Sequence, residues 1–146
     1  MMLVLLAHTA STLIMLGVIL IVQVVHYPLF AKVGTDGFVA YERQHARLIT
    51  FIVLPTMVIE LATAVALAWF QPYGLPAWQV WSGLGLVGVI WVSTAFLQVP
   101  AHAALATGFD AAVHRRLVST NWIRTVAWMA RSVLALLMLK ALLPDG

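Results

Sequence analysis

Residues 3–25 read LVLLAHTASTLIMLGVILIVQVV, and this stretch decides the fold. It contains no Asp, Glu, Lys or Arg, and the whole segment from Met1 to Ala31 is equally free of them. The hydrocarbon core of a bilayer requires about 20 consecutive apolar residues in a helix. The stretch also lacks a basic n-region and an A-x-A-like cleavage site, so we expect a membrane span here and not a secretory signal peptide.

Three further apolar runs follow, at residues 48–70, 78–99 and 117–143. The first of these contains one charge, Glu60, the next contains none, and the last contains Arg124, Arg131 and Lys140. Short loops join the runs, which makes consecutive helices antiparallel neighbours. We therefore predict an all-α protein, an integral membrane antiparallel four-helix bundle. It forms a single transmembrane domain over residues 1–146, with spans at about 3–27, 40–70, 78–101 and 113–142.

The composition excludes several classes of protein. Of the 146 residues 63% are hydrophobic and 9% charged, whereas a soluble domain has about 45–50% apolar and 25% charged residues. There is no cysteine, which excludes disulfides and thiolate metal sites. Any metal would need His, carboxylate or amide ligands, which suit iron, copper, zinc or manganese. The net charge of +3 is spread over scattered basic residues, which argues against nucleic acid and for contact with lipid headgroups.

The basic residues predict the orientation in the membrane. Lys140 is the one basic residue on the side of the bundle that holds the termini. The connections after the first and third spans carry five more, Lys32, Arg43, Arg47, Arg115 and Arg116, while Arg124 and Arg131 lie within the last span. Since basic loops stay in the cytoplasm, we expect a multi-pass protein of the cell inner (cytoplasmic) membrane with both termini outside. Asp110 is the expected N-cap of the last helix.

Each span carries one polar stripe at helical spacing. We expect the stripes to face one another inside the bundle. The stripes are His8, Thr12, Gln23 and His26 on the first span; Tyr41, His45, Thr56 and Thr63 on the second, with Glu60 at the edge; Trp91, Thr94, Gln98 and His102 on the third; and His114, Asn121 and Trp128 on the fourth, flanked by Arg124 and Arg131.

The antiparallel topology places four histidines at the cytoplasmic end: His26, His45, His102 and His114. Gln23, Gln98 and Asn121 lie slightly deeper, and His8 lies at the other end. Imidazoles are the commonest metal ligands, and bundles place such sites between facing helices. The histidines therefore form a site for a metal, a haem or a polar headgroup, or they only cap helices and meet lipid headgroups. No H-E-x-x-H motif is present.

Three charges lie well inside the spans. Each charge at the bilayer centre costs about 2.5–3.5 kcal/mol on insertion scales, so these charges should pair within the bundle. Glu60 and Arg131 lie at nearly equal depth, which predicts an ion pair between them. Arg124 is expected to face the polar site with Asn121 and Gln98. The alternative is an ion pair with a structural role only.

Two other patterns have simpler explanations. The segment Gly83-Leu84-Gly85-Leu86-Val87-Gly88 matches G-x-G-x-x-G but lies within an apolar span, where small residues allow close helix packing. Trp69, Trp78 and Trp81 form an aromatic belt at one membrane boundary. The deeper Trp91 and Trp128 either line a cavity for an aromatic substrate or pack between helices.

The segment Asn121-Trp122-Ile123-Arg124-Thr125 resembles the Asn-x-x-Arg-Thr found early in the last helix of the anthrone-oxygenase-like family of small four-helix membrane proteins. The segment 23–28, QVVHYP, is similar to the end of the first helix in that family. The resemblance implies an oxygenase ancestry, in which fungal members oxidise a polycyclic phenolic ketone to a quinone. It also implies that Asn121 and Arg124 form a polar pair near the site.

Two functions follow. The first is a membrane oxidoreductase or oxygenase acting on a hydrophobic aromatic or quinone-like small molecule. Its expected catalytic residues are Arg124, Asn121 and Glu60; its substrate-binding residues Gln23, Gln98, Trp91 and Trp128; and its metal ligands or proton carriers His26, His45, His102 and His114. It would use a His-ligated metal, a haem or no cofactor. The alternative is a non-enzymatic membrane module, either a small transporter that works as a homo-oligomer or an accessory subunit.

Overall fold

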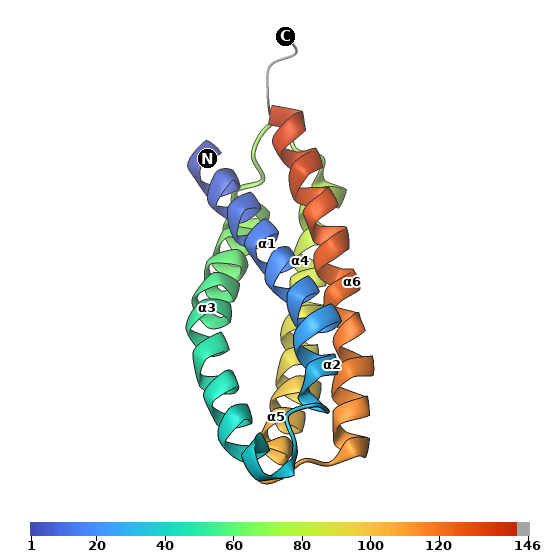
Figure 1. Cartoon of the computed structure of the whole chain (residues 1–146). Coiled ribbons are helices and arrows are strands. Elements are labelled where there is room, and N and C mark those ends of the chain that lie inside the picture. The colour runs from blue at the N-terminus through green and yellow to red at the C-terminus, as the bar shows by residue number, and fades with distance from the viewer. Residues whose placement is uncertain (143–146) are drawn as a thin grey trace.

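A computed structural model describes residues 1–142, which form four long antiparallel helical stretches (Figure 1). The last four residues of the expected domain lie outside the described part. The first stretch consists of α1 (Met2–Ile21), the π-helical segment η1 (Val22–His26) and α2 (Tyr27–Phe30), and the second is α3 (Thr35–Phe70). The third consists of α4 (Ala77–Ser93), the π-helical segment η2 (Thr94–Gln98) and α5 (Val99–Leu105). The fourth is α6 (Ala111–Leu142).

All four stretches are long and apolar enough to cross a membrane, which confirms the predicted fold class. They contain the expected spans and extend a few residues beyond them. The 36 residues of α3 and the 32 residues of α6 exceed the roughly 20 residues that cross a ~30 Å hydrocarbon core. The ends of these helices therefore reach into the headgroup region.

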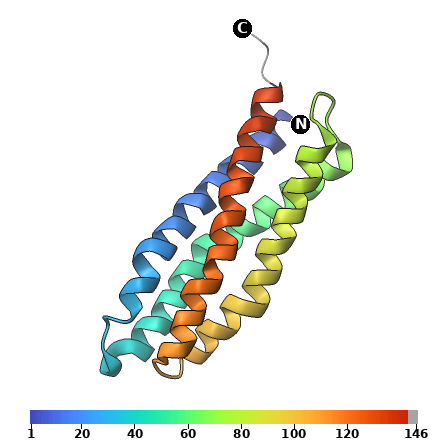
Figure 2. The same ribbon diagram turned by 90° about the vertical axis from the view of Figure 1, so that its right-hand side faces the viewer.

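The stretches form a closed ring of neighbours. Consecutive stretches pack against each other, and α6 also packs against α1 (Figures 1 and 2). We call the end with the connections 31–34 and 106–110 the basic end; it lies at the bottom of Figure 1. Met2 and Leu142 lie at the opposite end, together with the connection 71–76 (Figure 1).

Two connections at the basic end show why the chain turns where it does. Gly34 adopts φ 85°, a left-handed conformation that glycine adopts without strain, and α3 begins directly after it. Asp110 caps α6 as predicted: its Oδ1 accepts hydrogen bonds from the backbone N–H of Ala112 at 2.7 Å and of Val113 at 2.9 Å. These two donors hold the pKa of Asp110 below its ordinary value.

The π-helical segments η1 and η2 occupy matching places in the first and third stretches. Each ends two residues before a proline, Pro28 or Pro100, which has no backbone N–H to donate. π-helical turns are rare and frequent at functional sites. Here each one contains a buried glutamine, Gln23 in η1 and Gln98 in η2. The chain therefore departs from regular α-helix where polar side chains enter the bundle.

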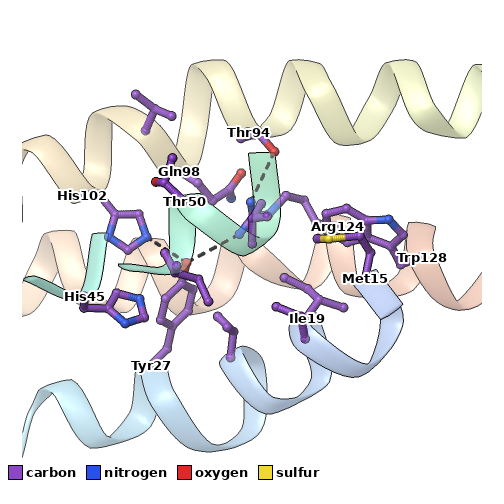
Figure 3. A pocket seen from close by; sticks show the side chains of 15 residues that line it. Met15, Ile19, Tyr27, His45, Thr50, Thr94, Gln98, His102, Arg124 and Trp128 are labelled. Carbon is purple, nitrogen blue, oxygen red and sulfur yellow. Dashed lines mark hydrogen bonds between the residues drawn. The ribbon is translucent and has the colours of Figure 1, made fainter. Parts of the chain in front are cut away.

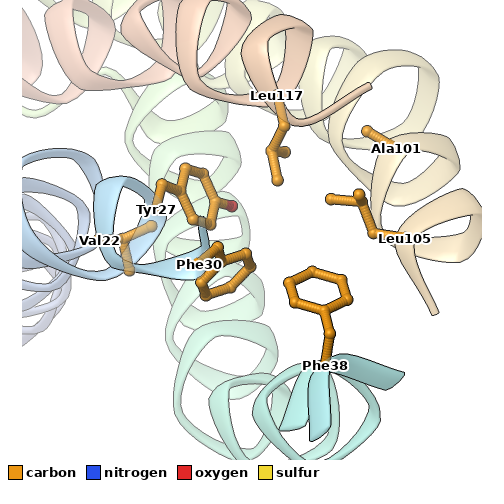
Figure 4. Close-up of a cluster of buried hydrophobic side chains, with 7 residues drawn as sticks. All are labelled: Val22, Tyr27, Phe30, Phe38, Ala101, Leu105 and Leu117. Atoms are coloured by element: carbon orange, nitrogen blue, oxygen red, sulfur yellow. The ribbon is translucent and has the colours of Figure 1, made fainter. Parts of the chain in front are cut away.

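The apolar core consists of three clusters stacked along the bundle. Figure 4 shows the cluster nearest the basic end, in which the rings of Tyr27, Phe30 and Phe38 lie beside aliphatic side chains of α5 and α6. A middle cluster surrounds Trp128, and a third lies around Leu5 and Met138. The polar side chains of interest lie between and beside these clusters.

Candidate functional site

Arg124 lies at the centre of the candidate site and is only 6% exposed. Its Nη1 donates to Thr94 Oγ1 at 3.2 Å, and its Nη2 to the Tyr27 hydroxyl oxygen at 3.5 Å. Its Nε donates to Asn121 Oδ1 at 2.9 Å, and Nη2 contacts the same oxygen. Among residues 1–142 no carboxylate forms an ion pair with Arg124. A buried cation without a counter-charge is costly wherever it lies in the bundle, so the site favours a ligand or intermediate with negative charge.

Asn121 is oriented from the opposite helix. Its Nδ2 donates to Gln23 Oε1 at 2.7 Å, and Gln23 Nε2 donates to the Val118 carbonyl oxygen at 3.2 Å. These bonds leave Asn121 Oδ1 pointing at Arg124, so η1 and α6 together fix the direction of the guanidinium. The expectation that Asn121 and Arg124 form a polar pair is confirmed.

A chain of three ionisable side chains leads to the same place. Glu42 Oε1 lies 2.5 Å from His102 Nδ1, and His102 Nε2 lies 2.9 Å from the Tyr27 hydroxyl oxygen. A neutral His102 fits this chain in one tautomer, in which Nδ1 donates to the Glu42 carboxylate and Nε2 accepts from Tyr27. Glu42 is fully buried, and its Oε2 has no hydrogen-bond partner. The Tyr27 oxygen therefore lies between a base, His102, and a cation, Arg124.

These groups border a partly open cavity of about 120 Å³ between the helices (Figure 3). Figure 3 shows the Tyr27 hydroxyl between His102 and Arg124, with the hydrogen bonds drawn as dashed lines. Met15, Ile19 and Val53 are among the apolar side chains of the wall. Trp128 closes the far side, and the Arg124 guanidinium carbon lies 6.0 Å from its ring centroid. A small apolar cavity with a few convergent polar groups is the usual form of a ligand site.

A second polar group, which we call the Glu60 network, lies toward the opposite end. Glu60 Oε1 accepts from Arg131 Nε at 2.9 Å and from Thr12 Oγ1 at 2.8 Å, and Oε2 accepts from Trp128 Nε1 at 3.0 Å. The predicted ion pair between Glu60 and Arg131 is confirmed. Arg131 Nη1 also donates to the Gly83 carbonyl oxygen. Glu60 does not line the cavity and reaches it only through Trp128, so its catalytic role stays a prediction.

The four histidines of the basic end have different environments. His102 lines the cavity and has hydrogen bonds at both ring nitrogens. His114 Nε2 lies 2.7 Å from the Tyr27 carbonyl oxygen, away from the cavity. The rings of His26 and His45 lie 5.3 Å apart, and those of His45 and His102 lie 6.0 Å apart.

These positions bear on the predicted metal. Within residues 1–142 no three His, Asp or Glu side chains are arranged to hold a metal ion. His102 and His114 each use one ring nitrogen in a hydrogen bond with Tyr27. A metal or haem at the four histidines therefore stays a prediction without support from their arrangement.

The predicted substrate-binding residues divide into two sets. Gln98 and Trp128 line the cavity. Gln98 Oε1 accepts from Ser93 at 3.0 Å, and its Nε2 donates to Thr120 at 3.2 Å. Gln23 does not line the cavity but accepts a hydrogen bond from Asn121, which in turn contacts Arg124. Trp91 is half-buried against the middle apolar cluster and does not line the cavity.

Sequence analysis missed Glu42 and the role of Tyr27. Glu42 precedes the apolar run that begins at residue 48, so it was not counted among the charges of the spans. It stands three residues before His45, and this E-x-x-H spacing was the signal that could have drawn attention to it. Tyr27 lies directly before Pro28, where η1 gives way to α2.

Comparison of the chain with protein-family models, with curated proteins and with solved structures finds no match. The fold and the buried charges define an integral membrane bundle with an internal polar site. The resemblance to the anthrone-oxygenase-like family stays a prediction.

Proposed function

We propose that the protein is a membrane oxidoreductase of the oxygenase type, acting on hydrophobic aromatic or quinone-like molecules. The observation that carries the proposal is Arg124, a buried cation with no carboxylate partner, which lies beside the Tyr27–His102–Glu42 chain on an apolar cavity. A substrate that ionises to a phenolate or enolate supplies the missing negative charge. Guanidinium groups aimed at such a developing charge are among the strongest catalytic devices.

The proton transfer follows from the hydrogen bonds. Tyr27 gives its hydroxyl proton to His102 Nε2, and Glu42 stabilises the imidazolium through Nδ1, in the manner of a catalytic triad. The Tyr27 oxygen then takes a proton from an acidic C–H or O–H of the substrate. Arg124 stabilises the oxygen on which the negative charge comes to rest.

Oxidation consumes dioxygen as co-reactant. For an anthrone-type substrate the ring methylene reacts as CH₂ + O₂ → C=O + H₂O. The carbon loses four electrons, dioxygen gains four, and its two oxygen atoms appear in the carbonyl group and in water. The ionised substrate is the species that reacts with oxygen, so the protein's task is to produce and hold that anion.

We place the protein in the inner (cytoplasmic) membrane with the basic end in the cytoplasm. Lys32, Arg43, Arg47, Arg115 and Arg116 belong to this end, and Lys140 to the other. The positive-inside rule supports this orientation. The motif around Asn121 and Arg124 supports the oxygenase assignment.

The test uses the full chain in lipid nanodiscs with anthrone as the probe. Without oxygen, exchange of the ring methylene protons for deuterium reports the proton transfer alone. With oxygen, anthraquinone absorbance and oxygen uptake report the complete reaction at one O₂ per anthrone. The Tyr27→Phe variant removes the acid–base oxygen and should slow both reactions by about 10²–10⁴-fold, the usual contribution of a general base.

Tyr73→Phe is the matched control, because Tyr73 is fully exposed in the connection between α3 and α4. It should behave as the wild type. The proposal is wrong if the wild type exchanges and oxidises anthrone no faster than empty nanodiscs, or if the Tyr27 variant keeps the wild-type rates.

One observation favours the alternative, a small oligomeric transporter or accessory subunit. The Glu60 network extends the series of buried ionisable groups toward the opposite end of the bundle, as a relay across the membrane would require. In that case anthrone turnover would be absent, and the protein would purify as a detergent-stable oligomer or with a partner.

A further inference from the structure

An open groove lies on the outside of the bundle beside the cavity. Its volume is about 450 Å³, and its wall consists of His26 from η1 and six residues of α3: Tyr41, Gln44, His45, Leu48, Ile49 and Ile52. Leu48 and Ile52 are 56% and 51% exposed. Because α3 is long and apolar enough to span a membrane, the Ile52 end of this groove faces the lipid.

The groove and the cavity share part of their walls. His45 and Ile49 line both of them. The two spaces therefore adjoin at these two side chains of α3. A molecule that moves from the groove toward Tyr27 passes His45 and Ile49.

The His45 ring is held by packing alone. It packs against Tyr41 and Phe30, with centroids at 6.3 Å and 5.1 Å. Within residues 1–142 its ring nitrogens form no hydrogen bond, whereas both nitrogens of His102 are bonded. A turn of the His45 ring therefore breaks no hydrogen bond and gives up only its contacts with neighbouring rings.

The size of the cavity restricts what enters it. At about 120 Å³ it is smaller than the engineered ~150 Å³ cavity that holds one benzene molecule. It accepts one aromatic ring at most. A fused-ring or substituted substrate must leave the rest of its body elsewhere, and the adjoining groove has the volume for it.

The level of the groove in the membrane fits an amphipathic molecule. Trp69 is 82% exposed near the end of α3 and marks one membrane boundary. About 20 helical residues cross the hydrocarbon core, which puts the other boundary near Thr50. Ile52 then meets acyl chains, Leu48 and Ile49 lie at the boundary itself, and His45 and Gln44 lie at the headgroups.

We propose that this groove is a lateral entrance and binding site for a lipid-dissolved aromatic molecule of more than one ring. One outer ring passes His45 and Ile49 into the cavity, and the remainder stays in the groove. This inference rests on the proposed function for the chemistry of the molecule that enters.

The test is photolabelling with 4-hydroxybenzophenone, a phenol of two rings that inserts into nearby C–H bonds under ultraviolet light. The wild type in nanodiscs should carry the label on the groove at residues 48–52 and on the cavity wall at Met15 or Val53, as read by peptide mass spectrometry. Ile49→Trp fills the shared wall and should reduce cavity labelling at least about tenfold, because bulk added to a packed wall is poorly accommodated.

Two variants control the experiment. Val58→Trp places the same bulk on the lipid-facing side of α3, away from both spaces, and should label as the wild type. Ile49→Ala enlarges the passage and should raise cavity labelling, which keeps the test decisive if the tryptophan variant does not fold. Cavity labelling that is equal in all three variants, or a groove without label, overturns the entrance.

Anthrone turnover separates this inference from the proposed function. Turnover that survives Ile49→Trp unchanged disproves the entrance and leaves the chemistry standing. The expected labelling in a protein that does not oxidise anthrone disproves the oxygenase and leaves the entrance standing as a binding site.

Discussion

Replacement of Glu60 by leucine tests how the bundle holds charge in the middle of the membrane. The carboxylate accepts three hydrogen bonds, from Arg131, Thr12 and Trp128, at 2.8–3.0 Å. Glu60→Leu removes all three and leaves the Arg131 guanidinium, which is 1% exposed, without its counter-charge. Losing one partner of a buried ion pair costs about 3–5 kcal/mol. That is a large share of the roughly 5–15 kcal/mol that stabilises a typical domain.

A double-mutant cycle separates the charge effect from the loss of packing. In the variant Glu60→Leu/Arg131→Met both charges are gone, so the free energy of unfolding should recover most of what the single variant loses. The measurement is reversible unfolding in mixed detergent micelles, followed by far-ultraviolet circular dichroism. Asp36→Asn, at an exposed acid in the first turn of α3, is the control and should change little. A Glu60→Leu variant within about 1 kcal/mol of the wild type, or single costs that simply add, would refute the reasoning.

Three further predictions concern single positions. Asn121→Ala should lower the free energy of unfolding by about 1–3 kcal/mol for each buried group that it leaves unbonded, and it should also slow anthrone turnover because Arg124 loses its orientation. Gly74→Ala should destabilise the protein in thermal unfolding, since Gly74 has φ 91° and the added Cβ would lie 3.2 Å from a leucine side chain. The pKa of Asp110 is lowered in the folded protein, so its cap contributes its full stability above pH 3.8, the ordinary pKa of the group. That stability is lost as the pH falls through the lower pKa of the folded state. Amide exchange at the start of α6 should accelerate in that range, and Asp110→Asn should abolish the acceleration.

The fold could be predicted because the apolar runs and short connections that determine it are visible in the sequence. A segment of some 20 residues without charge has few stable places other than a bilayer, and short connections force antiparallel neighbours. The pairing of Glu60 with Arg131 also followed from depth alone, since a helix advances about 1.5 Å per residue. These inferences needed only the helical repeat and the cost of an unpaired charge.

The candidate site was harder to predict, because its details depend on side-chain direction. The four histidines do share one end of the bundle, but His114 turns its ring toward the Tyr27 carbonyl oxygen and His102 pairs with Glu42. Glu42 was overlooked because α3 begins at Thr35, well before its apolar run. Neither the rotamers nor the extension of α3 beyond the hydrocarbon core is visible in hydrophobic periodicity.

The pairing of Glu60 with Arg131 has a consequence in an energised cell. A transmembrane voltage of 100 mV does about 2.3 kcal/mol of work on one elementary charge that crosses it. The two partners carry opposite charges at the same depth, so the forces on them cancel. Arg124 has no carboxylate partner in residues 1–142, so this cancellation does not extend to it. The bundle can therefore keep the Glu60–Arg131 pair inside a polarised membrane without the voltage driving that pair in either direction.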